Sequence, residues 1–274
     1  MKKRTDFIFI TLVYRNYNDL YAFCDSLKQN VVDSYEVVIV DAFYDNDTSS
    51  KISKCAKELE CYYIQTNNGG YGYGNNQGFE YVKKVFEYKY VFVCNPDTVL
   101  KNKLSLDMFK EDSLCIAPKI ISRNGKNQNP YWVCENRISE YLMYKGYQNN
   151  NKIILYIGIG INKIIREIFN IFIKYSKKSV HSIYACHGSF FALNKEFLEN
   201  CQFRYDEKMF LFYEEAYLAK EIKKNKQKVH YYKDIIVFHN EDGSMSIANI
   251  KEYPHLKKSY IHYYEKYRKN RSEQ

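Results

Sequence analysis

Short apolar runs alternate with amphipathic segments through the first hundred residues, and this alternation constrains the fold more than any other feature. Residues 6–14, 35–43, 61–66 and 90–100 are typical of buried strands, the last of which stops at Pro96. The segments between them carry apolar residues at helical spacing. Strands that alternate with helices form a parallel sheet through right-handed crossovers. The sequence therefore predicts an α/β fold with a mixed, mainly parallel sheet flanked by helices.

Polar residues follow three of the four predicted strands. Asp41 lies near the end of the second strand, a glycine- and asparagine-rich segment at 66–78 follows the third, and Asn95-Pro96-Asp97 interrupts the fourth. In a parallel sheet the carboxyl ends of the strands share one edge, and open α/β sheets bind their ligands there. We therefore expect a ligand site built from these three features.

The segment "TNNGGYGYGNNQG" at 66–78 is similar to a phosphate-binding cradle. The dinucleotide fingerprint Gly-x-Gly-x-x-Gly would place a glycine at Gln77, and it would follow the first strand rather than the third. A dinucleotide-binding fold is therefore not expected. A flexible surface loop is the alternative, and Asn75 or Asn76 is expected to cap the helix that follows.

The net charge and the cysteines indicate which ligands and which cellular compartment suit the chain. The 274 residues carry 41 Lys and Arg against 32 Asp and Glu, a net charge of +9, which suits either a plain basic surface or a preference for phosphate-bearing ligands and anionic membranes. No recognisable nucleic-acid-binding module accompanies this charge, so no nucleic acid is expected. The eight cysteines form no Cys-x-x-Cys pair, and with no secretory signal they predict reduced thiols in the cytoplasm.

The segment 153–175 predicts a basic amphipathic helix. No apolar run reaches the roughly 20 residues that a membrane span needs. Apolar residues recur there at helical spacing: Ile157, Ile161, Ile164, Ile165, Ile168, Ile171 and Phe172. The charged interruptions are Lys163, Arg166, Glu167 and Lys174. Such a helix could lie in a membrane interface, pack on the protein's own core or bind a second copy in a homodimer.

Four acidic or histidine side chains are candidates for chemistry. Asp97 at the sheet edge suits a hard cation such as Mg²⁺ or Mn²⁺, although an Asn-Pro-Asp turn alone is the alternative. Glu214 and Glu215 begin a helix in apolar surroundings, which raises a carboxyl pKa and suits a general base, or they complement the helix dipole. His239 ends an apolar run, as a metal ligand or as a strand-end histidine satisfied by its neighbours.

Six motifs follow one another along the chain. They are Asp41, the Gly/Asn segment, Asn95-Pro96-Asp97, "HGSFFALNKEF" at 187–197, "YDEKMFLFYEEAYL" at 205–218 and "VFHNEDGSMS" at 237–246. In this order they resemble the family-2 inverting glycosyltransferases with the GT-A fold, especially the rhamnosyltransferase-like branch that assembles bacterial surface polysaccharides. The resemblance covers roughly residues 8–246.

The resemblance implies a single GT-A domain over residues 1–250 and a basic helical tail at 251–274. Residues 1–104 would form the nucleotide-sugar-binding half, and residues 105–250 the acceptor half with the helical insert near 151–178. The implied reaction is metal-dependent transfer of a sugar from a nucleoside-diphosphate donor, of the dTDP-rhamnose or UDP-hexose type, to a saccharide hydroxyl.

The implied acceptor is a saccharide or a lipid-linked saccharide at the inner membrane face, in capsule or O-antigen synthesis. A non-catalytic nucleotide-sugar-binding scaffold and a nucleotidyltransferase are the alternatives. Arg15 and Ala42 stand where the family usually has Asn, which leaves UDP and dTDP open as the donor nucleotide.

The resemblance also implies a role for individual residues. Tyr14 and Asp41 would contact the nucleobase, Asn95 the ribose or sugar, and Gly188 and Ser189 the acceptor side. The Gly/Asn segment would line the nucleotide-sugar site through Gly74, Asn76 and Gly78. Asp97 would bind the cation that bridges the donor diphosphate, and His239 would close over both. Glu215 would be the catalytic base, with Glu214 as its competitor.

Overall fold

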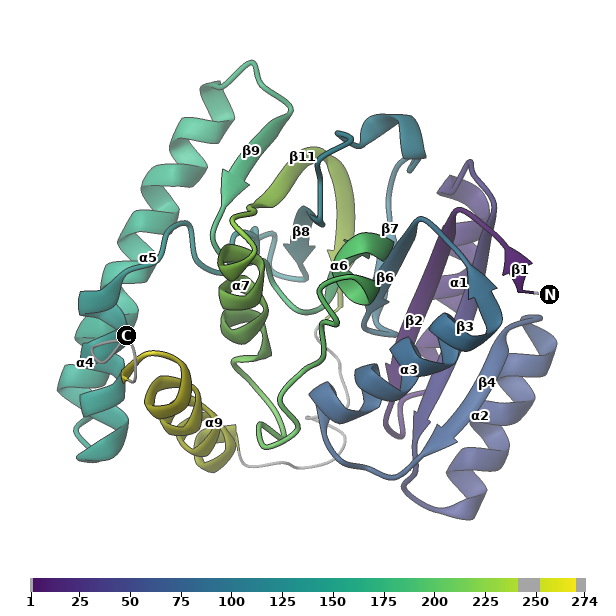
Figure 1. Cartoon of the computed structure of the whole chain (residues 1–274), viewed down its shortest axis with the longest axis horizontal. Helices are drawn as coiled ribbons and strands as arrows, with labels where there is room; N and C mark the ends of the chain where they lie inside the picture. The colour runs from purple at the N-terminus through teal and green to yellow at the C-terminus, as the bar shows by residue number, and fades with distance from the viewer. Residues whose placement is uncertain (1, 241–251, 270–274) are drawn as a thin grey trace.

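The computed structural model describes residues 2–240 and 252–269, which form one nine-stranded sheet and a separate two-stranded sheet (Figure 1). In spatial order the large sheet contains β4 (Tyr62–Thr66), β3 (Tyr35–Ala42), β2 (Phe7–Val13), β6 (Tyr90–Cys94), β10 (Phe190–Asn194), β8 (Cys115–Ser122), β11 (Val229–His239) and β7 (Thr98–Leu100). The ninth strand, β9 (Val180–Ile183), pairs with β11. The small sheet joins β1 (Lys3–Arg4) to β5 (Phe86–Glu87).

The first four strands in this order run parallel, as predicted. β2 pairs in parallel with β3 and β6, and β3 pairs in parallel with β4. β10 is antiparallel to both of its neighbours, β6 and β8. The predicted mixed, mainly parallel α/β sheet is therefore confirmed.

Side chains alternate between the two faces along a strand, and in the parallel strands both sets are apolar. Helices therefore cover both faces of these strands. Phe7 and Phe9 of β2 pack in the cluster that contains apolar residues of α1 (Asp19–Asn30) and α2 (Asn46–Glu58). Ile8 and Ile10 pack in the opposite cluster with α3 (Tyr71–Val85). The result is three layers with the sheet in the middle.

The fourth predicted strand is two strands in different parts of the sheet. β6 stops at Cys94, as the proline predicted, and the chain turns at Asn95-Pro96-Asp97. β7 then pairs antiparallel with the end of β11, far from β6 in the strand order. This turn therefore carries the chain from the middle of the sheet to its other end.

Helix α3 begins earlier than predicted. It starts at Tyr71, after Gly70 at φ 94°, so Asn75 and Asn76 lie inside the helix and the prediction that one of them caps it is wrong. Gly70 supplies the start because its backbone conformation is one that side-chain-bearing residues rarely adopt. A Cβ there would also lie 2.0 Å from the Phe210 carbonyl oxygen.

The described chain after β7 carries further helices before, between and after the strands β8, β9, β10 and β11. It contains η1 (Leu106–Met108), α4 (Arg137–Gln148), α5 (Lys152–Tyr175), α6 (Lys195–Glu199), α7 (Glu214–Lys224) and α9 (Glu252–Tyr267). The predicted amphipathic insert is the single helix α5, which packs against α4. Among the described helices, none is long and apolar enough to cross a membrane.

The segment predicted as a tail packs with the half of the chain that follows residue 105. Tyr260 and Tyr263 of α9 are buried in one cluster with Tyr144 and Tyr147 of α4 and with Ala216 of α7. Residues 252–269 therefore share a hydrophobic cluster with the helices of that half.

We expect Gly78→Ala to destabilise the protein by about 1–3 kcal/mol, because overpacking forces neighbouring groups to move. The added methyl group would meet Ile10 Cγ2 at 2.8 Å on the sheet beneath α3. Gly160→Ala in α5 is the matched control, because a Cβ there meets nothing within 4 Å. That variant should gain up to about 1 kcal/mol from helix propensity. Urea unfolding measures both, and equal stability of the two variants would contradict the packing role.

Candidate active site

The carboxyl ends of β3, β2 and β6 form one edge of the sheet. These three strands are parallel neighbours, so residues that follow them lie along the same edge. Tyr14 follows β2, Asp41 lies near the end of β3, and Asn95 and Asp97 follow β6. The structure therefore brings together the polar features that the sequence predicted at this edge.

Asp41 presents a hydrogen-bond acceptor with no protein donor. Its side chain is buried, and its Oδ2 accepts a hydrogen bond of 2.8 Å from the Tyr63 hydroxyl. Its Oδ1 is also buried and has no hydrogen-bond partner. An unpaired buried acceptor is costly, so this oxygen suits a ligand that carries an N–H or O–H donor.

Aromatic rings lie at the ends of the same strands. The Tyr14 and Tyr44 rings meet edge to face at 5.7 Å, and the Arg15 guanidinium lies 4.3 Å from the centre of the Tyr44 ring. Arg15 itself has a left-handed backbone, with φ 70°. Aromatic faces and a guanidinium plane are groups that stack with planar ligands. Tyr44 and the stacking of Arg15 were not predicted, because the sequence gives no register between the two strand ends.

Asp97 and His239 meet although 142 residues separate them. The antiparallel register of β7 and β11 pairs His239 with Thr98, and Asn240 N–H donates to the Asp97 carbonyl. The distance between Asp97 Oδ1 and His239 Nε2 is 3.4 Å, and Asp97 Oδ2 is buried without a hydrogen-bond partner.

This pair fits a divalent cation. His239 Nδ1 lies 2.8 Å from Gln128 Oε1, so Nδ1 carries the proton in neutral His239 and Nε2 presents its lone pair to Asp97. The carboxylate is an oxygen ligand that suits Mg²⁺ or Mn²⁺, and the imidazole nitrogen favours Mn²⁺ over Mg²⁺, which prefers oxygen ligands. No cluster of three or more His, Cys, Asp or Glu ligands occurs in residues 2–240 and 252–269, so other ligands would come from substrate and water.

His187 is a neighbour of this pair that the sequence did not single out. Its ring centre lies 5.7 Å from that of His239, and its Nδ1 lies 2.9 Å from Ser189 Oγ. Burial, and then repulsion from His239, lower the pKa of His187 to about 3. The ring is therefore neutral at pH 7. Its position next to Gly188 in the "HGSFF" motif was the available signal.

Glu214 and Glu215 begin α7 after a strained connection. Phe212 and Tyr213 both have left-handed backbones, with φ 74° and 68°. This conformation costs on the order of 1–3 kcal/mol per residue and persists only where the surroundings impose it. Tyr213 is held by a hydroxyl contact of 3.0 Å with Tyr147 and by ring contact with Tyr260. This backbone conformation sets the direction in which the chain enters α7, where the two glutamates lie.

The two carboxylates differ in their surroundings. Glu214 is buried and its Oε1 has no hydrogen-bond partner, whereas Glu215 is half-buried and its Oε1 accepts a 3.3 Å hydrogen bond from Gly188 N–H. Burial raises the pKa of both carboxyl groups, and the charge of Glu215 raises that of Glu214 further. Glu215 is therefore the more accessible candidate base.

The turn at Gly188 and Ser189 connects the carboxylates to the sheet edge. Ser189 carbonyl accepts a 2.7 Å hydrogen bond from Asn95 N–H, and the Gly188 carbonyl accepts one of 2.6 Å from the Tyr71 hydroxyl. A Cβ on Gly188 would lie 2.8 Å from Glu215 Oε1, so a glycine lets the carboxylate approach this closely.

Gly74, Asn76 and Gly78 contact protein instead. A Cβ at Gly74 would meet Leu12, and one at Gly78 would meet Ile10 and Val40 of the sheet. Asn76 is buried: its Nδ2 donates to the Tyr205 carbonyl and to Glu207 Oε1, and its Oδ1 accepts from Tyr205 N–H. In this structure the three residues therefore act as packing and loop-holding groups.

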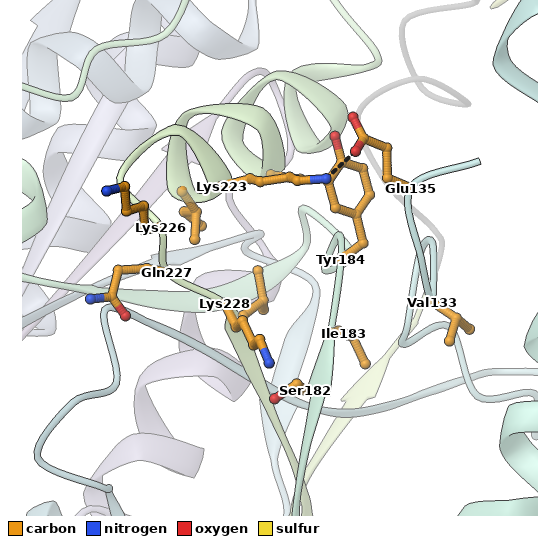
Figure 2. Close-up of a pocket in the computed structure, with 12 residues that line it drawn as sticks. Val133, Glu135, Ser182, Ile183, Tyr184, Lys223, Lys226, Gln227 and Lys228 are labelled. Atoms are coloured by element: carbon orange, nitrogen blue, oxygen red, sulfur yellow. Dashed lines mark hydrogen bonds and ion pairs between the residues drawn. The ribbon is translucent and has the colours of Figure 1, made fainter. Parts of the chain in front are cut away.

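A pocket of about 430 Å³ lies away from this edge, between α7 and β9 (Figure 2). Three lysines, Lys223, Lys226 and Lys228, are among its lining residues, and Lys223 forms an ion pair with Glu135. None of the predicted site residues is among those that line it. We therefore take the sheet edge, with its unpaired acceptors, as the candidate active site.

Parallel strands β4, β3, β2 and β6 followed by antiparallel β10, with a polar site at their carboxyl ends, define the GT-A class of glycosyltransferase fold. The family model described as "Glycosyl transferase family 2" matches residues 8–200. The match spans more than half of the chain, so the chain belongs to glycosyl transferase family 2. A search of curated proteins gives no match.

Solved structures show the same fold at low sequence identity. TarS from S. aureus in complex with UDP-GlcNAc is 14% identical with a TM-score of 0.56, over 90% of this chain and 61% of TarS 1–349. GalNAc-T7 with UDP, GalNAc and Mn²⁺ is 12% identical with a TM-score of 0.58, over 86% and 44%. The mannosyltransferase PcManGT from Pyrobaculum calidifontis, with GDP-Man and Mn²⁺, is 12% identical with a TM-score of 0.54, over 89% and 60%. The chain thus spans less than two thirds of each of these proteins.

We expect Asn76→Ala to lower the free energy of unfolding by about 1–3 kcal/mol, because it leaves the buried backbone of Tyr205 without its partners. Asn68→Ala, at an exposed position of the same segment, is the control and should change it by less than about 0.5 kcal/mol. Thermal or urea unfolding measures both. An Asn76→Ala protein as stable as the control would contradict the loop-holding role.

Proposed function

We propose that this protein transfers a sugar from a nucleoside-diphosphate donor to an acceptor hydroxyl with inversion at the anomeric carbon. The observation that carries the proposal is the turn at Gly188 and Ser189. This turn bonds Glu215 on one side and Asn95 on the other, next to the Asp97 and His239 pair. With a base and a cation site on either side of one turn, an acceptor hydroxyl would attack one face of the anomeric carbon, and the diphosphate would depart from the opposite face.

The nucleobase of the donor would lie at the ends of β2 and β3. Asp41 Oδ1 would accept a hydrogen bond from a base N–H, which supplies the partner that the protein lacks. Tyr14, Arg15 and Tyr44 would form the aromatic and cationic wall beside it. Asn95 would face the ribose or the sugar. These placements are supported by the position of all five residues at one edge.

The diphosphate would lie over Asp97 and His239. A Mg²⁺ or Mn²⁺ ion held there would offset the charge that develops on the leaving diphosphate. Asp97 and His239 would hold and orient the ion, and Gln128 would keep the His239 proton on Nδ1. His187 is neutral, so it would add no positive charge that repels the ion. The Mn²⁺ present with GalNAc-T7 and PcManGT supports this choice of ion.

Glu215 would act as the general base. Its carboxylate would take the proton of the acceptor hydroxyl while that oxygen bonds to the anomeric carbon and the bond from this carbon to the diphosphate oxygen breaks. Gly188 N–H would hold the carboxylate in place during this step. Gly188 and Ser189 would then border the acceptor. One base suffices, whereas hydrolysis of a glycoside requires a carboxylate pair.

The donor would be of the dTDP-rhamnose or UDP-hexose type. The acceptor would be a saccharide or a lipid-linked saccharide, in capsule or O-antigen synthesis on the cytoplasmic side of the inner membrane. UDP, UDP-GlcNAc and GDP-Man in the related structures support nucleotide sugars as a class. Melting temperatures with UDP-, dTDP- and GDP-sugars, with and without Mn²⁺, would identify the donor, because a ligand that binds the folded state stabilises it.

We expect Glu215→Gln to lower the rate of sugar transfer by about 10²–10⁴-fold, because it removes the base. Asp97→Asn should lower it by about 10²-fold or more and also abolish the Mn²⁺-dependent rise in melting temperature with the donor. Asp25→Asn, at an exposed position of α1, is the control and should keep both.

Two outcomes of that experiment would change the proposal. A greater loss in Glu214→Gln than in Glu215→Gln would transfer the role of base to Glu214. A wild-type protein that binds the donor but transfers no sugar to any acceptor would favour a non-catalytic scaffold.

The pH dependence of kcat/KM should show the raised pKa of the base. Because burial raises the pKa of Glu215 above the ordinary 4.5, activity should fall with decreasing pH at a midpoint above 4.5. The deprotonated form is the active one, so activity rises as the pH passes upward through this pKa. A limb at or below pH 4.5 would contradict the assignment, and the residual activity of Glu215→Gln should lack the limb.

A further inference from the structure

Helix α5 lies along the outer side of the molecule and uses only one of its faces for packing (Figure 1). Its three buried residues are Leu155, Gly158 and Ile173. The Gly158 carbonyl accepts a 2.8 Å hydrogen bond from Ser139 Oγ of α4. The inner face of α5 therefore packs against α4, and the other side of this 24-residue helix, about 36 Å long, is exposed to solvent.

The opposite side carries a ridge of large apolar residues. Its members, called the α5 ridge here, are Ile153, Tyr156, Ile157, Ile164, Ile168, Ile171, Phe172 and Tyr175. They are 51% to 76% exposed, although the Phe172 ring contacts the His181 ring edge to face at 5.8 Å. At 3.6 residues per turn, most of them lie within a narrow sector of the helix surface. Of the alternatives that the sequence left open, burial of these side chains in the protein's own core is therefore excluded for the described residues.

Lysines line one flank of the ridge. Lys152, Lys163 and Lys174 are spaced by 11 residues, which returns to within about 20° of the same direction around a helix. All three are exposed, and exposed Lys177 and Lys178 follow the helix. Within Lys152–Tyr175 the sequence contains a single acidic residue, Glu167. An apolar ridge beside a row of long basic side chains matches a bilayer surface, where lysines reach the phosphates while apolar groups enter the acyl boundary.

We propose that α5 binds the interface of an anionic lipid bilayer, with the α5 ridge toward the acyl chains and its lysines at the headgroup phosphates. The net charge of +9 favours an anionic partner over a second copy of the same chain. Since no described helix can cross a membrane, and Lys163 and Glu167 interrupt this one midway, α5 lies on the surface.

The inner face of α5 connects this surface to the candidate active site. Asn170 Oδ1 lies 3.5 Å from Asn127 Nδ2, and the next residue in that loop, Gln128, holds His239. A membrane-bound α5 would keep the acceptor half close to lipid-borne substrates. That consequence rests on the proposed function, whereas the binding itself does not.

Flotation of the full-length chain with vesicles tests the proposal. The probes are phosphatidylcholine vesicles with and without about 30% phosphatidylglycerol at two salt concentrations. Wild-type protein should bind the anionic vesicles, and Ile164→Asp with Ile168→Asp should reduce the partition coefficient at least tenfold. Val32→Asp is the matched control, because Val32 is equally exposed at 63% but lies after α1. Circular dichroism and melting curves should show that all variants stay folded.

The lysine row has its own variant. Lys152→Gln, Lys163→Gln and Lys174→Gln together should lower binding to anionic vesicles about tenfold or more and remove most of its salt dependence, because screened headgroup contacts are lost. Equal vesicle binding by the ridge variant and wild type would overturn the proposal. So would a wild-type dimer that ignores vesicles and becomes monomeric in the ridge variant, since the ridge would then be a dimer interface. Loss of sugar transfer alone bears on the proposed function and not on this one.

Discussion

The turn at Gly188 and Ser189 is the constraint on which the candidate site depends. Three hydrogen bonds converge on it: from Asn95 N–H at the end of β6, from the Tyr71 hydroxyl at the start of α3, and from Gly188 N–H to Glu215. Each of these partners comes from a different part of the chain. A Cβ at position 188 would lie 2.8 Å from Glu215 Oε1, so a glycine lets this carboxylate approach the turn closely.

The strain before α7 is held by a helix that the sequence had set apart as a tail. Ser259 of α9 donates a 2.7 Å hydrogen bond to the Leu211 carbonyl, and the ring of Tyr260 contacts Tyr213. Burial favours the neutral form of Asp206, but hydrogen bonds from Tyr267, His262 and Lys266 hold the pKa of this carboxyl well below its usual value. Arg268, just past α9, forms ion pairs with Glu135 and Glu140. These contacts surround the loop and helix that present Glu214 and Glu215, so α9 contributes to the geometry of the acidic pair.

Local patterns predicted the strands of the first hundred residues well, because they report burial and periodicity directly. Four apolar runs became β4, β3, β2 and β6, and the proline ended β6 where expected. Within the Gly/Asn segment the same patterns placed the start of the helix too late. The glycines of this segment indicate that another group approaches the backbone closely. Only the packed structure shows that the sheet approaches Gly74 and Gly78, and that the Asn76 side chain is hydrogen-bonded to the backbone of Tyr205. His187 and Tyr44 escaped notice because a single histidine or tyrosine carries no periodic signal.

The sequence by itself determined the class of fold, the edge at which polar residues gather, and the amphipathic character of residues 153–175. These follow from the spacing of apolar residues and from strand-ending polar residues, which are local properties. Only the tertiary structure decided that β7 leaves β6 to pair with β11, that Asp97 thereby faces His239 at 3.4 Å, and that the α5 ridge stays exposed. Pairings across 142 residues, and the choice of which apolar face is buried, depend on how all the elements pack at once, and no local pattern encodes that.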